Sequence, residues 1–401
     1  MDSGQWPARP GADAPLFDPA LDPHGEEAIR RLTTLYGSPL LIVDAERLRA
    51  RYRRLAAALP GVDLHVALKP LPHRSVVEVL RDEGASFDLA TNGEVELARR
   101  ARVPADRCIH THPIKRDGDI RSALAAGLDT FVVDNPDEIR KFVHLRKQVR
   151  LLIRVAFRHP GALCDLSRKF GCDPADVEDL IGLAHSFDLR VRGLSFHVGS
   201  QASDSMMHVE AVAACAALFE RAAARGVRLE ILDIGGGFPA DYREPALPIE
   251  RFCAPIRTAL AALPREVRVI AEPGRYIVAP AAVGVATVMG RARRGDRWWY
   301  YLDDGLYGSY SGRLYDHASY QIDALTHGAE RLPSVLAGPT CDGIDVIEEN
   351  VALPRLAIGD LVIGRSMGAY TWASASEFNF FPKATVLVVD RGGLFGGRDS
   401  P

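Results

Sequence analysis

The chain has 401 residues, enough for two domains with a large core, and its 47% apolar and 25% charged residues are ordinary for a globular protein. A formal net charge of −3 and a pI near 6.5 argue against nucleic acid or an anionic membrane surface as a partner. No apolar run approaches the ~20 residues of a membrane span, and residues 1–25 lack the apolar stretch of a signal peptide.

The N-terminal segment leads into the first regular elements. Residues 1–25 are rich in Pro, Gly, Asp and Ala, which predicts a flexible arm. A helix is expected over 25–36 and a short apolar strand over 39–43. Asp44 is expected to cap the following helix, which runs to Leu59, because its carboxylate accepts hydrogen bonds from the first backbone N–H groups.

From residue 63 onward, apolar runs alternate with amphipathic stretches. Strands are predicted at 63–68, 86–89, 108–111, 130–133, 150–156, 191–196, 229–234 and 267–271. Helices are predicted between them at 74–83, 93–102, 136–147, 176–185, 207–225 and 249–263. Eight strands that alternate with helices predict an α/β fold, a (β/α)₈ TIM barrel within residues 40–280, with an open doubly wound sheet as the alternative.

The pattern changes after residue 280. Strands without long intervening helices are predicted at 283–289, 298–302, 321–325, 334–337, 361–363 and 384–389. Residues 281–390 are therefore expected to form a second, all-β domain, a sandwich or a small barrel, which the strand near 39–43 joins. Residues 391–401 are Gly-rich and are predicted to form a flexible tail.

The seventh predicted barrel strand ends in three glycines, Gly235, Gly236 and Gly237. Residues without side chains let backbone N–H groups surround an anion and reach left-handed φ values. The triplet therefore suggests a phosphate-binding turn. Taken alone it is more often only a tight turn, so its weight depends on the ends of the other strands.

The other strand ends carry reactive and charged side chains, and a TIM barrel places such residues together at its active-site end. Lys69 follows the first strand, where partial desolvation would make its amine a nucleophile; alone it would more often be a surface lysine. Asp88 is a partner for a cation, and the flat ring of His197 can cover a planar cofactor. Glu272 can hold a protonated ring nitrogen, and Arg275 can hold a phosphate.

A phosphate cradle, an amine, a ring cover and an anion for a ring nitrogen are the parts of a pyridoxal phosphate (PLP) site. An NAD site would need GxGxxG at the start of a helix, whereas these glycines run into Phe238 and Pro239. The twelve histidines show no HxxxH spacing, so no metal site is expected. The six cysteines show no CxxC spacing, which fits a reducing cytoplasm.

At this point the chain resembles the fold type III (alanine-racemase-type) PLP-dependent decarboxylases of basic amino acids, over about residues 40–382, and among them most closely the ornithine decarboxylases. The resemblance is carried by motifs at 66–69, 86–88, 196–200, 235–239, 272–275, 314–317, 338–343 and 367–370. Two departures are Pro70 after the lysine and Phe380 in a motif that usually reads Phe-Asn-Gly.

The resemblance implies a role for each matching residue. Lys69 would form the Schiff base, His197 would stack on the pyridine ring, and Cys341 would return a proton to the substrate α-carbon. Glu272 would pair with the ring nitrogen. Phosphate binding is implied for Ser200, Gly235, Gly236, Gly237, Arg275 and Tyr370, support of the cofactor pocket for Asp88 and Arg154, and substrate recognition for Tyr315, Asp316 and Asp342. The resemblance also implies a head-to-tail homodimer in which Cys341 reaches the partner subunit's Lys69.

The expected substrate is L-ornithine, with lysine second, because two carboxylates, Asp342 and Asp316, suit a distal ammonium and would repel the second carboxylate of diaminopimelate. One methylene is worth only ~1–3 kcal/mol of discrimination, and the two motif departures also leave a related diamino acid or a D-amino acid open. A racemase is a third option, but a racemase needs a tyrosine as its second base and lacks the Cys-Asp-Gly segment. The non-enzyme alternative is a decarboxylase-like regulatory protein that binds a partner protein.

Overall fold

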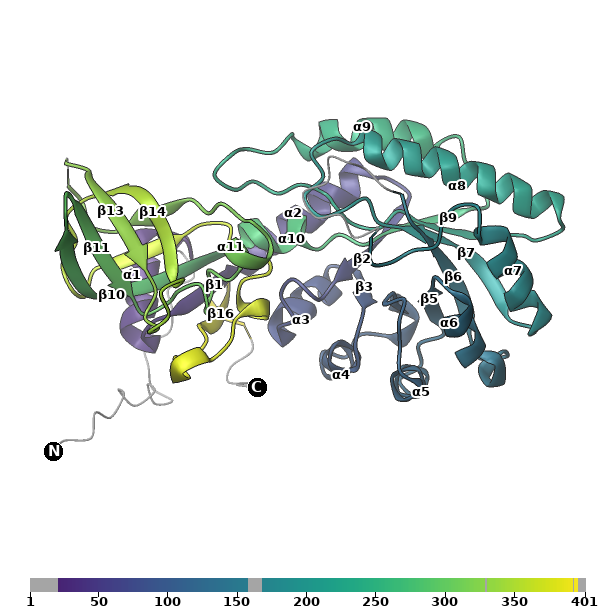
Figure 1. Cartoon of the computed structure of the whole chain (residues 1–401), viewed down its shortest axis with the longest axis horizontal. Coiled ribbons are helices and arrows are strands. Elements are labelled where there is room, and N and C mark those ends of the chain that lie inside the picture. Colours follow the sequence, from purple (N-terminus) through teal and green to yellow (C-terminus); the bar gives the residue numbers. More distant parts are fainter. Residues whose placement is uncertain (1–20, 158–167, 329, 392, 396–401) are drawn as a thin grey trace. The chain divides into compact units, whose positions relative to one another are not determined.

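A computed structural model describes residues 21–157, 168–328, 330–391 and 393–395. The predicted arm lies outside these residues up to residue 20, as does most of the predicted tail, 391–401. The chain divides into two compact units (Figure 1). One holds Arg49–Ala240 and Pro245–Ile277, and the other holds the remaining described residues. No helix among the described residues is long and apolar enough to cross a membrane.

The first unit is the predicted TIM barrel. Eight parallel strands close on themselves in chain order: β2 (Val62–Ala67), β3 (Ser86–Leu89), β4 (Cys108–His110), β5 (Thr130–Val133), β6 (Arg150–Val155), β7 (Arg190–Phe196), β8 (Ile231–Asp233) and β9 (Arg268–Ala271). All eight strands were predicted, and the closed barrel rules out the open sheet. Apolar side chains from five of the strands meet in one buried cluster: Ile109, Val132, Leu152, Ile231 and Ile270.

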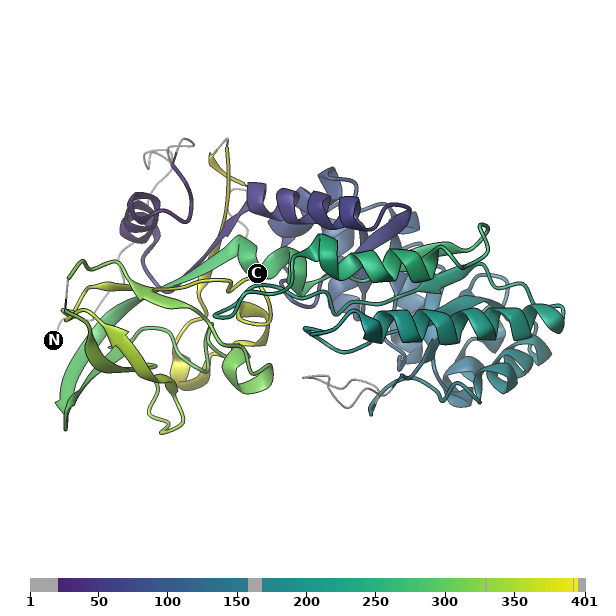
Figure 2. The ribbon, with the colours of Figure 1, turned by 90° about the horizontal axis from the view of Figure 1, so that it is seen from above.

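Helices surround the barrel strands (Figure 1). They are α3 (Arg74–Asp82), α4 (Asn92–Arg100), α5 (Asp117–Ala125), α6 (Pro136–Lys141), α7 (Val177–Ser186), α8 (Met206–Ala224), α9 (Ile249–Leu260) and the short α10 (Arg275–Val278). Seen from above, α8 and α9 run side by side (Figure 2). The helix α5 was missed because it buries only Ile120 and Ala123, so its sequence shows no clear helical pattern of apolar residues. The predicted helix 136–147 ends early, where Phe142 turns into the core against Phe131.

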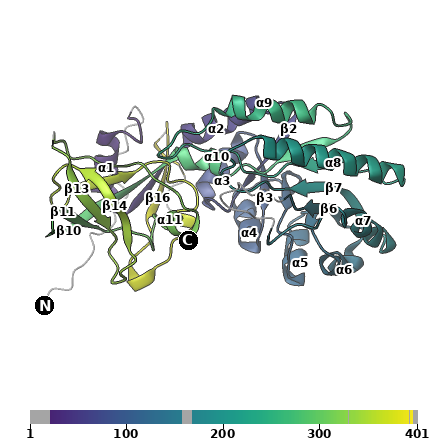
Figure 3. The same ribbon diagram turned by 45° about the horizontal axis from the view of Figure 1, so that its top comes forward.

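The second unit is built on one nine-stranded sheet, several strands of which are labelled on the left of Figure 3. Its strands are β1 (Leu40–Asp44), β10 (Ala282–Arg294), β11 (Arg297–Leu302), β12 (Ile322–Ala324), β13 (Leu332–Ala337), β14 (Val346–Leu353), β15 (Leu361–Gly364), β16 (Thr385–Asp390) and β17 (Gly393–Leu394). The strands β14 and β17 were missed. The polar Glu348, Glu349 and Asn350 hide β14, and β17 has two residues.

The long strand β10 joins the two halves of this sheet. Its first half pairs with β1 and β15, and from Val288 onward it pairs with β11 across a register shift. The strand β1 lies between β10, with which it is antiparallel, and β16, with which it is parallel. The N-terminal segment predicted at 39–43 therefore completes a sheet whose other strands all follow the barrel in the sequence.

The helices before the barrel begin as expected. In α2 (Ala45–Ala58), the Asp44 carboxylate accepts hydrogen bonds from the N–H groups of Glu46 (2.9 Å) and Arg47 (3.1 Å). In α1 (Glu26–Tyr36), Ile29 and Leu32 are fully buried in the apolar cluster that also contains residues of β1 and β10.

The close approach of β7 and β8 gives a test of the barrel. A Cβ at Gly193 would lie 1.9 Å from the carbonyl oxygen of Ile231, so we expect Gly193→Ala to lower the free energy of unfolding by about 1–3 kcal/mol. Urea denaturation measures this change. Gly182 in α7 is the matched control: it is exposed with no atom near its would-be Cβ, so Gly182→Ala should raise stability by roughly 0.5–1 kcal/mol. Equal stabilities of the two variants would contradict this packing.

Candidate active site

In a closed parallel barrel the carboxyl ends of all strands meet at one end, where side chains from distant parts of the sequence converge. Six barrel strands were predicted to contribute residues there, and the structure places these residues as expected: Lys69 follows β2, Asp88 lies in β3, Arg154 in β6, His197 and Ser200 follow β7, the glycines follow β8, and Glu272 and Arg275 follow β9. The remaining predicted residues belong to the β-rich unit: Tyr315, Asp316, Cys341, Asp342 and Tyr370.

Lys69 and Asp88 form an ion pair at this end of the barrel. The Lys69 Nζ donates to the Asp88 Oδ2 at 3.1 Å, and Asp88 Oδ1 accepts from the hydroxyl of Thr111. The Asp88 side chain is 1% exposed, whereas that of Lys69 is 41% exposed. The amine is thus oriented by a buried carboxylate while it remains accessible.

The triple glycine is packed too closely for any side chain. A Cβ would lie 2.2 Å from the Phe196 oxygen at Gly235, 2.7 Å from the Glu272 oxygen at Gly236, and 2.6 Å from the Gly199 oxygen at Gly237. Gly235 and Gly237 also have φ values of +64° and +97°, which favour glycine. The turn is therefore fixed by both conformation and space, as a backbone anion cradle requires.

Arg275 supplies a charge beside this turn. Its guanidinium donates to the Ser200 Oγ from Nε (3.2 Å) and from Nη2 (2.9 Å), and the side chain is buried. The Ser200 hydroxyl therefore orients this guanidinium. Together with the glycine N–H groups it suits a phosphate dianion.

A buried carboxyl pair lies beneath the cradle. Burial and the neighbouring carboxyl of Asp233 raise the pKa of Glu272 well above its usual value. Burial raises the pKa of Asp233 to about 6, although the N–H of Gly235 donates to its Oδ1 at 2.9 Å. Asp233 was not predicted as a site residue, because its role depends on the neighbour that the fold supplies. A protonated ring nitrogen would fit here, since it would offset negative charge that burial disfavours.

His197 is held as a neutral ring. Burial, Arg154 and Lys69 lower the pKa of its imidazole well below the usual value. The N–H of Gly199 donates to Nδ1 at 3.0 Å, which leaves the proton on Nε2. Arg154 stacks over Phe170, with its guanidinium carbon 5.5 Å from the ring centroid.

Glu94, at the start of α4, is a second titratable group that the sequence did not reveal. Burial raises its pKa to about 7, despite a hydrogen bond from the N–H of Ala90 (2.5 Å). Asp88 raises and Lys69 lowers this pKa, so Glu94 belongs to the same electrostatic cluster. Thr91 and Glu94 have the spacing of a capping box, and Thr91 Oγ1 accepts from the Glu94 N–H, but that motif marks a helix start and not a raised pKa.

In the β-rich unit, Cys341 and Asp342 lie on one exposed turn. The N–H of Cys341 donates to the Asn379 Oδ1 at 3.1 Å, and the thiol side chain is exposed. The hydroxyl of Tyr307 donates to the Asp342 Oδ2, and this hydrogen bond is the main reason that the pKa of Asp342 is lowered. Tyr307 was missed by the sequence, yet its hydrogen bond favours the ionised form of Asp342.

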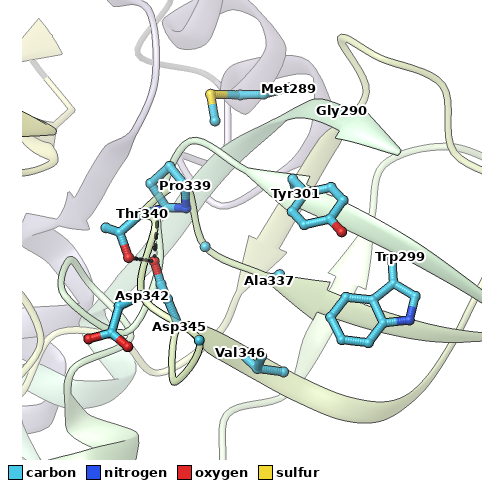
Figure 4. A pocket seen from close by; sticks show the side chains of 12 residues that line it. Met289, Gly290, Trp299, Tyr301, Ala337, Pro339, Thr340, Asp342, Asp345 and Val346 are labelled. Atoms are coloured by element: carbon cyan, nitrogen blue, oxygen red, sulfur yellow. Dashed lines mark hydrogen bonds between the residues drawn. The ribbon is translucent and has the colours of Figure 1, made fainter. Parts of the chain in front are cut away.

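The turn is anchored from behind by Asp345, which is buried. Its Oδ1 accepts from the N–H of Leu306 (2.7 Å), and its Oδ2 accepts from the N–H (3.0 Å) and hydroxyl (2.7 Å) of Thr340. Figure 4 shows Thr340 and Asp345 joined in this way, in a depression of about 430 Å³ whose other wall carries Trp299 and Tyr301. One side chain thus holds the Tyr307 loop and the Cys341 turn together.

The other three predicted residues also lie in this unit. Tyr315 ends the short helix α11 (Gly312–Tyr315) and is 70% exposed, and Asp316 follows it. Tyr370 has a φ of +54°, which is uncommon for a tyrosine. Residues held in such conformations by their surroundings often lie at functional sites. The hydroxyl of Ser311 donates to the Thr371 oxygen at 3.0 Å, which ties the α11 segment to the Tyr370 segment.

Comparison with known proteins agrees with this geometry. Residues 45–279 match the family described as "Pyridoxal-dependent decarboxylase, pyridoxal binding domain". The chain is 33% identical to a lysine/ornithine decarboxylase of Selenomonas ruminantium over 366 residues, 91% of this chain and 93% of that one. Two crystal structures of a Vibrio vulnificus lysine/ornithine decarboxylase are 52% identical over 91% of this chain. The putrescine complex is covered to 98% with a TM-score of 0.87, and the cadaverine complex to 96% with a TM-score of 0.88.

The crowded glycine turn allows a test by cofactor binding. A Cβ at Gly236 would press on the Glu272 oxygen and lie 3.2 Å from the His197 Nε2, so Gly236→Ala should displace both groups. We expect the affinity of the apoprotein for PLP to fall at least about tenfold, since 1.4 kcal/mol of strain suffices. Visible absorbance titration measures the affinity. Gly118→Ala in α5, an exposed position with open space, should leave it unchanged; an unaltered affinity in Gly236→Ala would refute the crowding.

Proposed function

The chain belongs to the pyridoxal-dependent decarboxylases, and from that premise we propose that it converts L-ornithine, and second L-lysine, to the corresponding diamine and CO₂. Whatever the exact substrate, the chain is a PLP-dependent decarboxylase of basic amino acids, so the non-catalytic regulatory alternative is set aside. The observation that carries the substrate proposal is the ionised Asp342 next to the exposed Cys341. A fixed carboxylate beside a thiol suits a substrate with a distal ammonium.

The relatives support both diamino acids. The Vibrio vulnificus structures contain putrescine and cadaverine, the diamines that ornithine and lysine yield on decarboxylation. We assign the distal ammonium to Asp342 and Asp316, with Tyr315 beside them. We place ornithine first because the motifs Leu-Tyr-Asp-His (314–317) and Cys-Asp-Gly (341–343) resemble those of ornithine decarboxylases most closely. Lysine remains a substrate because one extra methylene changes the binding free energy only slightly.

The barrel residues would hold the cofactor as follows. Lys69, oriented by Asp88, would bind the aldehyde, and the neutral His197 ring would cover the pyridine. Glu272, supported by Asp233, would hold the ring nitrogen. The phosphate would lie on the triple glycine, with Ser200, Arg275 and Tyr370 as further donors and Arg154 in support of the pocket. Bound PLP supplies the electron sink that accepts the electron pair left when the carboxylate departs.

The chain then has to control two protons, one at the ring nitrogen and one at the substrate α-carbon. Glu272 keeps a proton at the ring nitrogen, and such a preorganised group can be worth about 10²–10³ in rate. The Cys341 thiol delivers a proton to the substrate α-carbon. The backbone of Cys341 is held in place by the hydrogen bond from its N–H to Asn379. The Tyr307 hydroxyl fixes the Asp342 carboxylate and favours its charged form, so that the substrate ammonium has one preferred position.

We further propose a head-to-tail homodimer in which Cys341 of one subunit serves the Lys69 site of the other. An exposed thiol with Ile344 (55% exposed) two residues beyond the acidic Asp342 supports a surface that a second chain covers.

The free thiols of all five described cysteines support a reducing, cytoplasmic location; Cys164 lies outside the described residues.

The substrate proposal is tested by CO₂ release from L- and D-ornithine, L-lysine, L-arginine and meso-diaminopimelate, with ornithine and lysine expected to lead. In Asp342→Asn we expect kcat/KM for ornithine to fall about 10–100-fold, mainly through KM, because a hydrogen bond to a charged group is lost. Asp296→Asn, in the β10–β11 turn, is the control and should match the unaltered protein. Preference for diaminopimelate or arginine, or an unchanged KM in Asp342→Asn, would overturn the assignment.

The Tyr307 hydrogen bond predicts a change in pH dependence. Asp342 must be ionised to bind an ammonium, so activity is present above its pKa and is lost as the pH falls through it. Since Tyr307 is the largest cause of the lowered pKa, Tyr307→Phe should raise that pKa and move the acid limb of kcat/KM for ornithine to higher pH. Tyr36→Phe in α1 should leave the profile unchanged. An identical acid limb in Tyr307→Phe would show that Asp342 is not the group that titrates.

A further inference from the structure

Residues 378–380 form a turn whose backbone conformation is unusual. Asn379 (φ +55°) and Phe380 (φ +62°) are consecutive left-handed residues. Asparagine tolerates such a φ, whereas for a bulky phenylalanine it is a true outlier. Two hydrogen bonds close the turn, from the N–H of Phe380 to the Glu377 oxygen (3.0 Å) and from the N–H of Phe381 to the Phe378 oxygen (3.3 Å). The strain is therefore held in place by its surroundings.

The turn is connected to both residues proposed to act on the substrate. Asn379 accepts the hydrogen bond from the N–H of Cys341. Phe378 stacks on Tyr307, with ring centroids 4.4 Å apart and planes at 27°, and Tyr307 donates to Asp342. The turn, the thiol and the anionic carboxylate thus form one connected unit on the surface of the sheet unit.

The ring of Phe380 is 99% exposed, although a phenyl group gains from burial. The left-handed backbone and the exposure of an aromatic ring each lower the stability of the fold. Such strain is retained at functional positions. The ring also lies next in sequence to Asn379, which touches the turn of Cys341 and Asp342. Phe378 and Tyr307 connect the same turn to the Asp342 carboxylate. An accessible aromatic face on a turn linked to a carboxylate suits an ammonium on an alkyl chain, since the face attracts the cation and the methylenes pack on the ring.

We propose that Phe380 is a specificity-determining residue whose ring covers the alkylammonium end of the bound diamino acid beside Asp342. This inference rests on the proposed function and deepens it. It explains why a phenylalanine occupies a left-handed position that glycine would occupy without strain. The ring excludes water from the contact between ammonium and carboxylate, which strengthens that contact, and it senses the length of the alkyl chain.

Three substitutions separate the ring from the backbone. Phe380→Asn removes the ring but keeps a residue that tolerates left-handed φ, Phe380→Gly removes the ring and the strain, and Phe380→Tyr keeps the ring. Ile358→Asn is the matched control, because Ile358 is 65% exposed on the same unit and belongs to no site. Each holoenzyme is titrated calorimetrically with 1,4-diaminobutane and 1,5-diaminopentane, and KM and kcat are measured for ornithine and lysine.

In Phe380→Asn and Phe380→Gly we expect diamine affinity to fall about tenfold, KM to rise more than kcat falls, and the ornithine-to-lysine preference to change by at least about threefold. Phe380→Tyr and Ile358→Asn should stay within about twofold of the unaltered protein. Unchanged diamine affinity in the Asn and Gly variants would overturn the proposal, as would a loss in Asn alone, which would mean a backbone effect.

Sedimentation measurements complete the test. If the Asn and Gly variants dissociate into monomers yet bind diamines normally when assembled, the ring contacts a second copy of the chain and the proposal is wrong. Failure of the proposed function is recognised separately: the unaltered protein would then release no CO₂ from ornithine or lysine, whereas the diamine titrations still report on the ring.

Discussion

The site depends on how closely the ends of β7, β8 and β9 approach one another. Backbone oxygens of Phe196, Gly199 and Glu272 occupy the space where side chains of the triple glycine would lie. Any residue with a Cβ would separate these strand ends. Because they stay together, the Asp233 and Glu272 carboxyls share one buried environment and His197 lies over Gly236. The electrostatic character of the site follows from a steric constraint on the backbone.

The sequence predicted the barrel well because strands of a parallel barrel are buried on both faces and appear as short apolar runs. The ends of β3 and β5 agree with the prediction to the residue, whereas α5 and β14 were missed because few of their side chains are buried. The rule that active residues follow barrel strands then made Lys69 and Glu272 candidates, and both lie just past barrel strands. Asp233, Glu94 and Tyr307 could not be found in this way, since a raised pKa or a hydrogen bond depends on neighbours far away in sequence.

The two units contribute different chemistry. The barrel unit holds buried charged groups in hydrogen bonds, such as Arg275 with Ser200 and Asp88 with Lys69. The sheet unit presents an exposed thiol, an ionised carboxylate and a bare aromatic ring on short turns. Rigid, desolvated groups suit a cofactor that stays bound, while accessible groups suit a substrate that enters and a product that leaves in each cycle.

The position of β1 has a consequence for synthesis of the chain. This apolar strand emerges from the ribosome before the barrel, yet its two neighbours, β10 and β16, are made only after the barrel is complete. The barrel segment can fold during translation while β1 waits with both edges unpaired, in a state open to pairing with other nascent chains. The sheet around β1 can therefore be completed only after β10 and β16 have been synthesised.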